Sequence, residues 1–468
     1  MNSQIYTDLR QISRSLKTAE HTYGIYTTEY NNTYKQLMND LKEKYTDEII
    51  KLYESIYTSI DYIDFTKRYL CHKLSNEYNH ELIDKIGPDC WNLIAEYLRI
   101  DNIGSLMSTG MPFLKLFGNG DTKYRKKYLQ IKHMRFGNQP DQLLYLPSSL
   151  THLTFCISFN QRIDNLRLPL SLTHLTFNDQ FNQPIDNLIL PSSLTNLMFG
   201  YCFNQPIDNL RLPSSLTNLM FGYCFNQPID NLILPSSLTT LNFGGKFNQS
   251  VDNLHLPSSL THLTFGHDFN QPIDNLHLPS SLLHLIFWFE FDQPIDNLHL
   301  PSSLKRLELG VKFNQPVDNL HLPSALTHLR FSNNFNRSVD NLHFPSSLTH
   351  LDFGYKFNQP VDNLRLPSSL THLEFGDGFN QPVDNLRLPS SLTCLSFYHN
   401  TELSIFNQPV DNLRLPSSLT RLEFGANFNQ SIKNLHLPSS LTHLILGTNF
   451  NQSIDNLILP RLCSILLL

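Results

Sequence analysis

Most of the chain repeats one pattern of apolar and polar positions every 22 residues. Fourteen units carry the same marker Phe, from Phe159 to Phe450, and a five-residue insertion near residues 398–405 is the one interruption. In a representative unit, residues 260–281, the large apolar residues are Leu260, Leu263, Phe265, Phe269, Ile273, Leu276 and Leu278. A fixed period of this length predicts a stack of equivalent coils that share one continuous core.

Two short alternations in each unit predict β-strands. Leu263-x-Phe265 and Leu276-x-Leu278 have the period of two that points alternate side chains into a core. A Pro follows the second alternation in every unit, and nine of the fourteen units carry another Pro three residues after the marker Phe. These prolines leave too little uninterrupted chain for a helix. We therefore expect each coil to run strand, turn, strand, turn, with successive coils about 4.8 Å apart.

Two Asn residues also recur in the units. The first follows the marker Phe, as in Asn270, with Asp292 as the single exception, and the second precedes a Leu, as in Asn275. An Asn side chain can both donate and accept hydrogen bonds, to turn backbone or to its copies in neighbouring coils. We expect both columns to form structural ladders inside the stack.

The repeated motif Phe-Asn-Gln-Pro-Ile/Val-Asp-Asn-Leu-x-Leu-Pro-Ser-Ser-Leu resembles the FNIP repeat of amoebal and giant-virus proteins, which is similar to leucine-rich repeats. The resemblance implies a leucine-rich-repeat-like β-solenoid of fourteen coils at residues 149–460. A basic junction and a degenerate first repeat precede it at 126–148, and a truncated terminal coil follows at 461–468. The motif places Phe-Asn where leucine-rich repeats have Asn-x-Leu, so convex helices are not expected.

The first 125 residues lack the repeat and predict helices. Apolar residues at steps of three and four from Tyr34 to Ile60 predict a long amphipathic helix within segment 1–80. Segment 81–125 carries two shorter apolar stripes, one starting at Pro88 and one after Asp101. The expected fold class is therefore α+β, with a small all-helical N-terminal head before the solenoid.

Segment 81–125 resembles the F-box, a compact helical module that docks onto the adaptor subunit of a cullin-RING ubiquitin ligase. The adaptor-binding residues that the resemblance implies are Ile86, Pro88, Trp91, Ile94, Tyr97, Leu98, Ile103 and Leu106. Pro88 stands one place later than in the family. An ordinary helical cap for the solenoid is the alternative interpretation.

Positions that vary between otherwise similar units are candidates for a binding surface. We expect the third, fifth and seventh positions of the first strand segment to face outward. They form a patch of mixed charge with an aromatic residue at each end, a composition that suits a protein interface. The predicted target-binding residues are Trp288, Arg306, Glu308, Arg330, Asp352, Glu374 and Tyr398. A solvated sheet face is the alternative.

Two columns of basic or imidazole side chains suggest other chemistry. Third-position His residues, such as His350, could ligate a metal, but no Cys, Asp or Glu recurs beside them, so no metal site is predicted. A second column, which includes His277 and Arg365, looks basic. An Asp nearby in almost every coil partly neutralises it, which favours a solvated face over a phosphate track.

Composition and charge limit the function further. The net charge of -6 argues against binding held mainly by nucleic-acid phosphates. No apolar run reaches the length needed to cross a bilayer, and the start lacks a secretion signal. Seven Cys with no Cys-x-x-Cys pair indicate neither a disulfide framework nor a zinc site. We expect an intracellular protein, in the host cytoplasm or the nucleus.

No P-loop, nucleophile elbow or zinc-protease motif is present in the sequence, so we expect neither catalysis nor a cofactor. The favoured hypothesis is a substrate-recruiting subunit of an SCF-type ubiquitin ligase, whose head binds the adaptor and cullin complex and whose repeats bind a protein target. The alternative is a structural protein that self-associates through an apolar edge at the C-terminal coil.

Overall fold

The computed structural model describes residues 132–136, 146–164, 166–398, 403–454, 457–461 and 463–467. The predicted amphipathic segment 1–80, the F-box-like segment 81–125 and most of the junction 126–148 lie outside the described residues, and so do all eight predicted adaptor-binding residues. The chain separates into two compact units, Met1–Asn178 and Asp179–Leu468. Each unit is treated by itself below.

The described part of the first unit contains three parallel strands. They are β1 (His133–Phe136), β2 (His152–Phe155) and β3 (His174–Thr176). His133 pairs with His152, and His152 pairs with His174, so equivalent residues stand beside one another. Segment 126–148, predicted as a basic junction with a degenerate first repeat, therefore contributes a strand, β1, to the stack.

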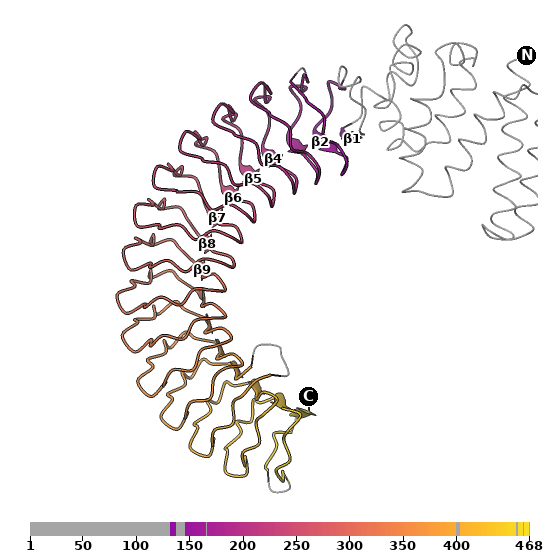
Figure 1. Cartoon of the computed structure of the whole chain (residues 1–468). Coiled ribbons are helices and arrows are strands. Elements are labelled where there is room, and N and C mark those ends of the chain that lie inside the picture. Colours follow the sequence, from indigo (N-terminus) through magenta and orange to yellow (C-terminus); the bar gives the residue numbers. More distant parts are fainter. Residues whose placement is uncertain are drawn as a thin grey trace, which may run out of the picture. The chain divides into compact units, whose positions relative to one another are not determined.

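The second unit continues the pattern with thirteen parallel strands, each paired with the next in chain order (Figure 1). They are β4 (Asn196–Met198), β5 (Asn218–Met220), β6 (Thr240–Asn242), β7 (His262–Thr264), β8 (His284–Ile286), β9 (Arg306–Glu308), β10 (His328–Arg330), β11 (His350–Asp352), β12 (His372–Glu374), β13 (Cys394–Ser396), β14 (Arg421–Glu423), β15 (His443–Leu446) and β16 (Ser464–Leu467). Strand β16 shows that the predicted truncated coil also adds a strand, in register with β15.

Each described coil contains one strand, not the two that the alternations predict. Leu276 and Leu278 lie in chain without strand pairing. The reason is the spacing of the coils. The rings of His328 and His350, on the outer face of the sheet, are 4.2 Å apart, whereas the buried rings of Phe335 and Phe357 are 6.1 Å apart. Backbone pairing between strands needs about 4.8 Å, so a ladder forms at the sheet and in the turn that follows it, where Asp268 N–H donates to the Gly245 carbonyl oxygen at 2.7 Å, and not at the wider spacing.

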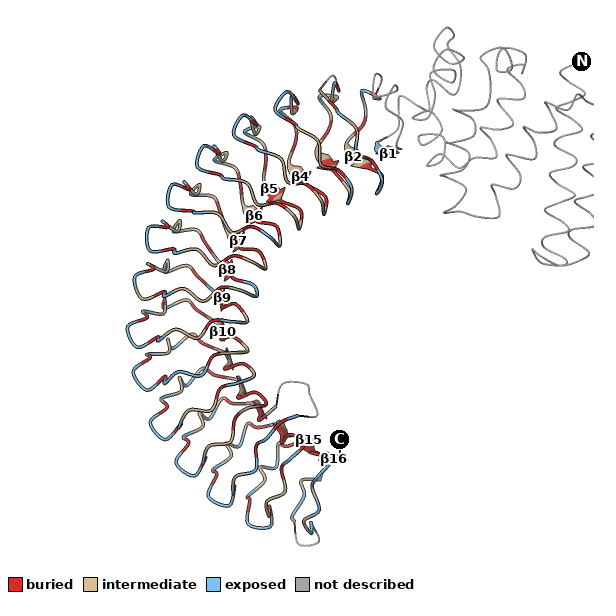
Figure 2. Ribbon diagram, viewed as in Figure 1, coloured by how far each residue is buried: buried red, intermediate tan, exposed pale blue. Residues whose placement is uncertain are grey.

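The same difference in spacing curves the stack of residues 179–468. The coils are closest together at the solvent-facing side of the sheet and farther apart across the core. The stack therefore bends so that the sheet lies on its concave side (Figure 1). The loops on the outer side of the curve carry most of the exposed residues (Figure 2). The uniform spacing expected from the sequence is therefore wrong away from the sheet.

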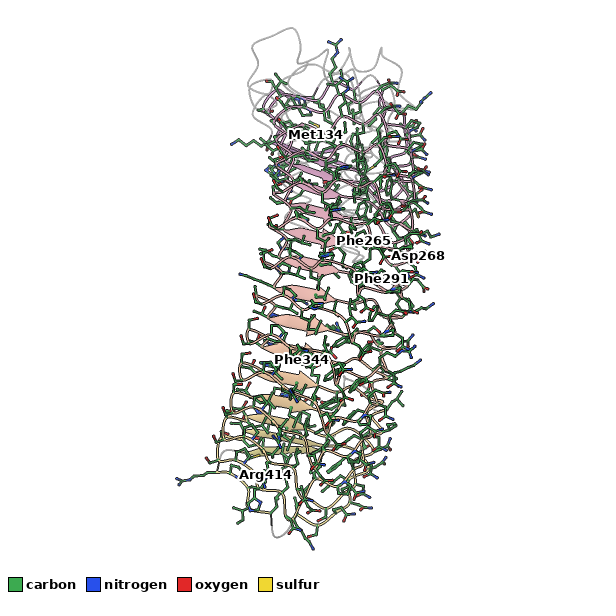
Figure 3. The ribbon with its side chains drawn as sticks, turned by 90° about the vertical axis from the view of Figure 1, so that its left-hand side faces the viewer. Met134, Phe265, Asp268, Phe291, Phe344 and Arg414 are labelled. Carbon is green, nitrogen blue, oxygen red and sulfur yellow. The ribbon has the colours of Figure 1, made fainter. Side chains whose placement is uncertain are left out.

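The core consists of columns of identical apolar residues. Six of the seven apolar positions predicted for unit 260–281 are buried, from Leu260 to Leu276, and Leu278 is half-buried. Phe265 and Phe269 stack on one another at 4.2 Å, and each stacks on its copy in the next coil. The side chains in Figure 3 follow these columns from coil to coil.

At the seventh position, which was predicted to face outward, the backbone of most coils instead lies very close to the backbone of the preceding coil. A Cβ added to Gly222 would lie 1.6 Å from the carbonyl oxygen of Gly200, and a Cβ on Gly244 would meet Gly222 in the same way. Glycine recurs there because a side chain would clash with the preceding coil.

The first Asn column forms the predicted ladder. The backbone N–H of Asn270 donates to Asn248 Oδ1 at 2.9 Å, and Gln271 Nε2 donates to the same oxygen at 2.9 Å. The side chain thus bridges coils where they are too far apart for backbone pairing. The second column also bridges coils, since Asn275 Nδ2 donates to Asp252 Oδ1 at 3.3 Å, but it is exposed and not inside the stack as expected.

Candidate protein-binding surface

A shallow hollow of about 250 Å³ lies on the outer face of the sheet over β9 to β12. Its lining residues are Arg306, Leu307, Glu308, His328, Leu329, Arg330, His350, Leu351, Asp352, His372 and Glu374. Five of the seven predicted target-binding residues are among them. The structure therefore brings together the charged part of the predicted surface.

The strand geometry explains why these side chains face outward. In each three-residue strand the central Leu is buried, as for Leu329 at 2% exposure, and its two neighbours project from the opposite face. Parallel register then places His328 beside His350 and Arg330 beside Asp352. Residues that are 22 positions apart in the chain become immediate neighbours.

Ion pairs cross the hollow. Arg306 bonds Glu308 on the same strand, and Arg330 Nε lies 3.0 Å from Asp352 Oδ2 on the next strand. The backbone N–H of Gly354 also donates to Asp352 Oδ1 at 2.8 Å. The two Arg side chains are about half exposed, whereas their carboxylate partners are mostly covered. Pairs with this exposure add little stability, about 0–1 kcal/mol each, but they fix the positions of the charges.

A row of three imidazole rings forms part of the hollow. His328, His350 and His372 are stacked at centroid spacings of 4.2 Å with nearly parallel planes. In each coil the ring Nδ1 lies 2.9 Å from the hydroxyl oxygen of the preceding Thr, as for Thr349 and His350.

The hydroxyl contacts determine which ring nitrogen carries the proton. Thr349 Oγ1 donates its single proton to the carbonyl oxygen of Thr327 at 3.0 Å, and Thr371 donates to Thr349 in the same way. The hydroxyl has no second proton for the ring, so the ring Nδ1–H must donate to the hydroxyl. In the neutral ring, Nε2 is then the unprotonated nitrogen, and it has no hydrogen-bond partner among the described residues.

Two rings of the imidazole row have a lowered pKa. Burial, followed by the neighbouring His372 and His328, lowers the pKa of His350 from 6.5 to about 4. Burial, followed by Arg306 and His372, lowers the pKa of His328 as well. At neutral pH, His328 and His350 therefore present acceptors and not imidazolium cations.

Trp288 lies outside the hollow, after the end of β8, and its side chain is 57% exposed. It occupies the seventh position, where most coils have Gly. The adjacent Phe289 is also exposed and stacks on His267 at 4.6 Å, with Lys312 Nζ 5.9 Å from its ring centroid. An exposed aromatic pair at a turn where most coils have Gly is a candidate anchor for a partner.

Tyr398 is half-buried beside β14 and does not line the hollow. Burial, and then the charge of Glu423, raises its pKa, and Arg421 hydrogen-bonds its side chain. Arg421 also pairs with Glu423. The structure therefore places this predicted residue in a separate polar cluster.

Sequence reasoning did not assign the three His residues of the hollow to the binding surface. The third-position column was predicted to face outward, with metal ligation, a solvated face and protein recognition as the interpretations, but no His was named among the target-binding residues. Within the described ranges, no group of three or more His, Cys, Asp or Glu could hold a metal ion. The Thr-His dipeptide at the start of consecutive strands was the available signal, because it fixes the ring orientation.

Two other expectations concern the described part of the chain. The cysteines described there, Cys156, Cys202, Cys224, Cys394 and Cys463, are free. No helix in the same part is long and apolar enough to span a bilayer.

The fold and the variable sheet face define this chain as a leucine-rich-repeat-like β-solenoid protein. The model of the FNIP Repeat family matches residues 159–202, 203–246, 247–288, 291–334, 313–356, 357–400, 406–449 and 428–467. The chain therefore belongs to the FNIP repeat family. The match begins at residue 159, and no F-box was detected.

Among solved structures, the chain is similar to CroV588, described as a circular LRR protein, with 43% identity and a TM-score of 0.57. The alignment covers 72% of this chain and 56% of CroV588, so the chain spans little more than half of that structure. An internalin, InlF from Listeria monocytogenes str. 4b F2365, is 19% identical with a TM-score of 0.40, over 73% of this chain and 88% of the internalin. No curated protein matches the chain.

Proposed function

We propose that this protein is a non-enzymatic interaction scaffold that binds a protein target on the outer face of its sheet. The observation that carries the proposal is the hollow over β9 to β12, where variable charged residues of four successive coils form one continuous surface. The core columns stay nearly constant, so the variable side chains are free to differ without cost to the fold. Trp288 supplies an exposed aromatic anchor one coil away.

Two features of this surface favour a protein partner. The ion pairs Arg306–Glu308 and Arg330–Asp352 hold charges of both signs in fixed places, which gives specificity more than affinity. An exposed Trp beside such a patch has the composition of an interface hot spot. The hollow itself is smaller than the pockets of about 300–1,000 Å³ that usually enclose small molecules.

We further propose that the protein recruits its target to a cullin-RING ubiquitin ligase in the host cytoplasm. The support is the resemblance of segment 81–125 to the F-box. The head would bind the adaptor through Ile86, Trp91, Ile94 and their neighbours, and the solenoid would hold a target near the ligase. Its contribution would be a raised effective concentration of target, with catalysis performed by partners.

The test is affinity purification of the tagged full-length chain from host-cell lysate, followed by mass spectrometry. Adaptor and cullin peptides support the ligase proposal, and recovery of this chain alone supports the self-associating alternative. A Trp288→Ala, Arg330→Ala, Glu374→Ala triple variant should lose the target. A matched variant on the exposed second column, Arg365→Ala with Arg387→Ala, should retain it. Target binding that survives the triple variant would place the interface elsewhere.

A further inference from the structure

The three stacked imidazoles present a row of unprotonated nitrogen atoms to any partner at the hollow. Each Nδ1–H is committed to a Thr hydroxyl, so each Nε2 can only accept while the ring is neutral. Since the rings are nearly parallel at 4.2 Å, the three Nε2 lone pairs point in similar directions at about that spacing. A group that satisfies two neighbouring nitrogens must therefore carry two donors.

The charges of the hollow point to a cation. Its lining contains two guanidinium groups and three carboxylates, so the carboxylates are in the majority. Arg306 and Arg330 both lie at the β9–β10 end. Glu374 lies at the β12 end, within electrostatic reach of His350 on one side and Cys394 on the other. The acceptor-rich end is therefore formed by β11 and β12.

The spacing distinguishes among possible cations. Two hydrogen bonds of about 2.9 Å from a tetrahedral ammonium reach acceptors about 4.7 Å apart, close to the spacing of the row. The two donors that a guanidinium directs side by side match acceptors only about 2–3 Å apart, as in a carboxylate. A metal ion with bonds of about 2.1 Å would have to lie on the line between the two nitrogens, away from their lone pairs.

From this geometry we infer that His350, His372 and Glu374 form a binding site for a primary ammonium group, supplied by a lysine side chain of the protein target. Two N–H bonds go to the Nε2 atoms of His350 and His372, and the third donor faces Glu374. The long stem of a lysine allows the ammonium to reach the sheet from a partner that lies across the coils. This inference rests on the proposed function, because it names the chemistry of the partner at the same surface.

The experiment uses the full chain and short capped peptides, with binding followed through the imidazole Cε1–H resonances of ¹³C-His-labelled protein. The probes are acetyl-Gly-Gly-Lys-Gly-Gly-amide and the same peptide with norleucine, which keeps the stem without the ammonium, or with arginine. The lysine peptide should shift the resonances of His350 and His372 in a saturable way. Equal binding of the norleucine or arginine peptide would overturn the inference.

Two matched pairs of variants locate the site. Glu374→Gln should weaken lysine-peptide binding about tenfold, the usual effect of losing a charge-assisted bond. Glu290→Gln, at a carboxylate that pairs with Lys312 and does not line the hollow, should have little effect. His372→Phe keeps a stacked ring but removes the acceptor, and it should weaken binding, while His262→Phe on β7 should not. Binding unaffected by both Glu374→Gln and His372→Phe would refute the site.

A pH series distinguishes imidazole rings that accept hydrogen bonds from the ligand from rings that have only a structural role. The titratable or charged groups that face the site are Arg306 and Glu308 on β9, His328 and Arg330 on β10, His350 and Asp352 on β11, His372 and Glu374 on β12, and Cys394 on β13. Protonation of His350, whose pKa is lowered to about 4, replaces an acceptor by a cation, so lysine-peptide binding should fall as the pH approaches 4. Binding that strengthens on acidification would contradict the site.

Three further outcomes distinguish the ammonium site, the source of the ammonium and the proposed function. Loss of the target in the triple variant, combined with equal binding of lysine and norleucine peptides, would leave the scaffold proposal standing and overturn the ammonium site. A norleucine peptide with a free amino terminus that binds better than the capped lysine peptide would retain the ammonium site but overturn lysine as its source. Lysine-peptide binding that depends on Glu374, with no target recovered, would support the site and count against the scaffold.

Discussion

Asn226 offers the sharpest test of what joins the coils on the side away from the sheet. Its Oδ1 accepts the backbone N–H of Asn248 at 2.9 Å and Gln249 Nε2 at 2.9 Å, so Asn226→Ala removes both acceptor contacts at once. An unsatisfied backbone N–H costs about 1–3 kcal/mol when buried, and the Gln bond adds about 1 kcal/mol. Because the site is half-buried, we expect a loss of about 2 kcal/mol.

The chain itself supplies the matched control for this variant. Asp292 replaces Asn at the equivalent position, and its Oδ1 accepts the backbone N–H of Asn314 at 2.8 Å and Gln315 Nε2 at 3.0 Å. Asn226→Asp should therefore stay close to the wild type.

Hydrogen exchange is the appropriate assay, because each coil of a solenoid contacts only its neighbours and the damage should be local. A loss of about 2 kcal/mol corresponds to exchange about 30 times faster in the coils flanking Asn226. The melting temperature should fall in parallel. Equal exchange and equal melting of the Ala and Asp variants would refute the view that the Oδ1 acceptor joins the coils.

Three other substitutions or conditions test the core, the backbone contact and the imidazole row. Phe269→Ala should cost about 3–5 kcal/mol by leaving a cavity in the Phe column, whereas Ile233→Ala, at a side chain 84% exposed, should stay within about 0.5 kcal/mol in the same denaturant titration. Gly222→Ala should lower the free energy of unfolding by about 3 kcal/mol or more, because its Cβ would lie 1.6 Å from the Gly200 carbonyl oxygen. Gly378→Ala should lower it less, because the nearest atom to its Cβ would be 2.8 Å away. Equal melting curves of the two variants would contradict the clash. Thermal stability should decline as the pH falls from 6.5 towards about 4, because His350 binds a proton in the unfolded chain in that window but not in the folded chain, where its pKa is lowered. His350→Phe should flatten this pH dependence of the melting temperature. An unchanged slope would exclude His350 as its source.

The repeat by itself was sufficient to predict the coil, its first strand and its core. Leu263 and Phe265 are buried because an alternation of period two can bury only one face of a strand. The marker Phe is buried by stacking in every described coil except the last, where Phe450 is half-buried. The first Asn column was also predictable, since a recurrent amide beside a recurrent Phe needs a partner for its polar atoms. The charged residues of the hollow could be selected because their positions vary between units and face outward on the strand.

The second strand and the outward seventh position were predicted wrongly for a geometric reason. Sequence periodicity reports which side chains share a face, but it does not report the distance between coils. That distance is 4.2 Å at the His column and about 6 Å at the marker Phe column. At the wider spacing Leu276 and Leu278 cannot pair through their backbones, and at the turn after the strand the approach is so close that Gly222 has no room for a Cβ.

The sequence alone determined the 22-residue coil, the identity of the buried columns and the set of variable outward residues, because these depend on local alternation and on exact repetition. Only the tertiary structure decided the curvature, the single strand per coil and the tautomer of the imidazole row. Each of these depends on distances between residues 22 positions apart. The spacing of the coils determines the curvature and where strands can pair. The hydrogen bond of Thr349 to the preceding coil determines that the proton of His350 is on Nδ1. The chemistry of the hollow thus arises from stacking one coil on the next.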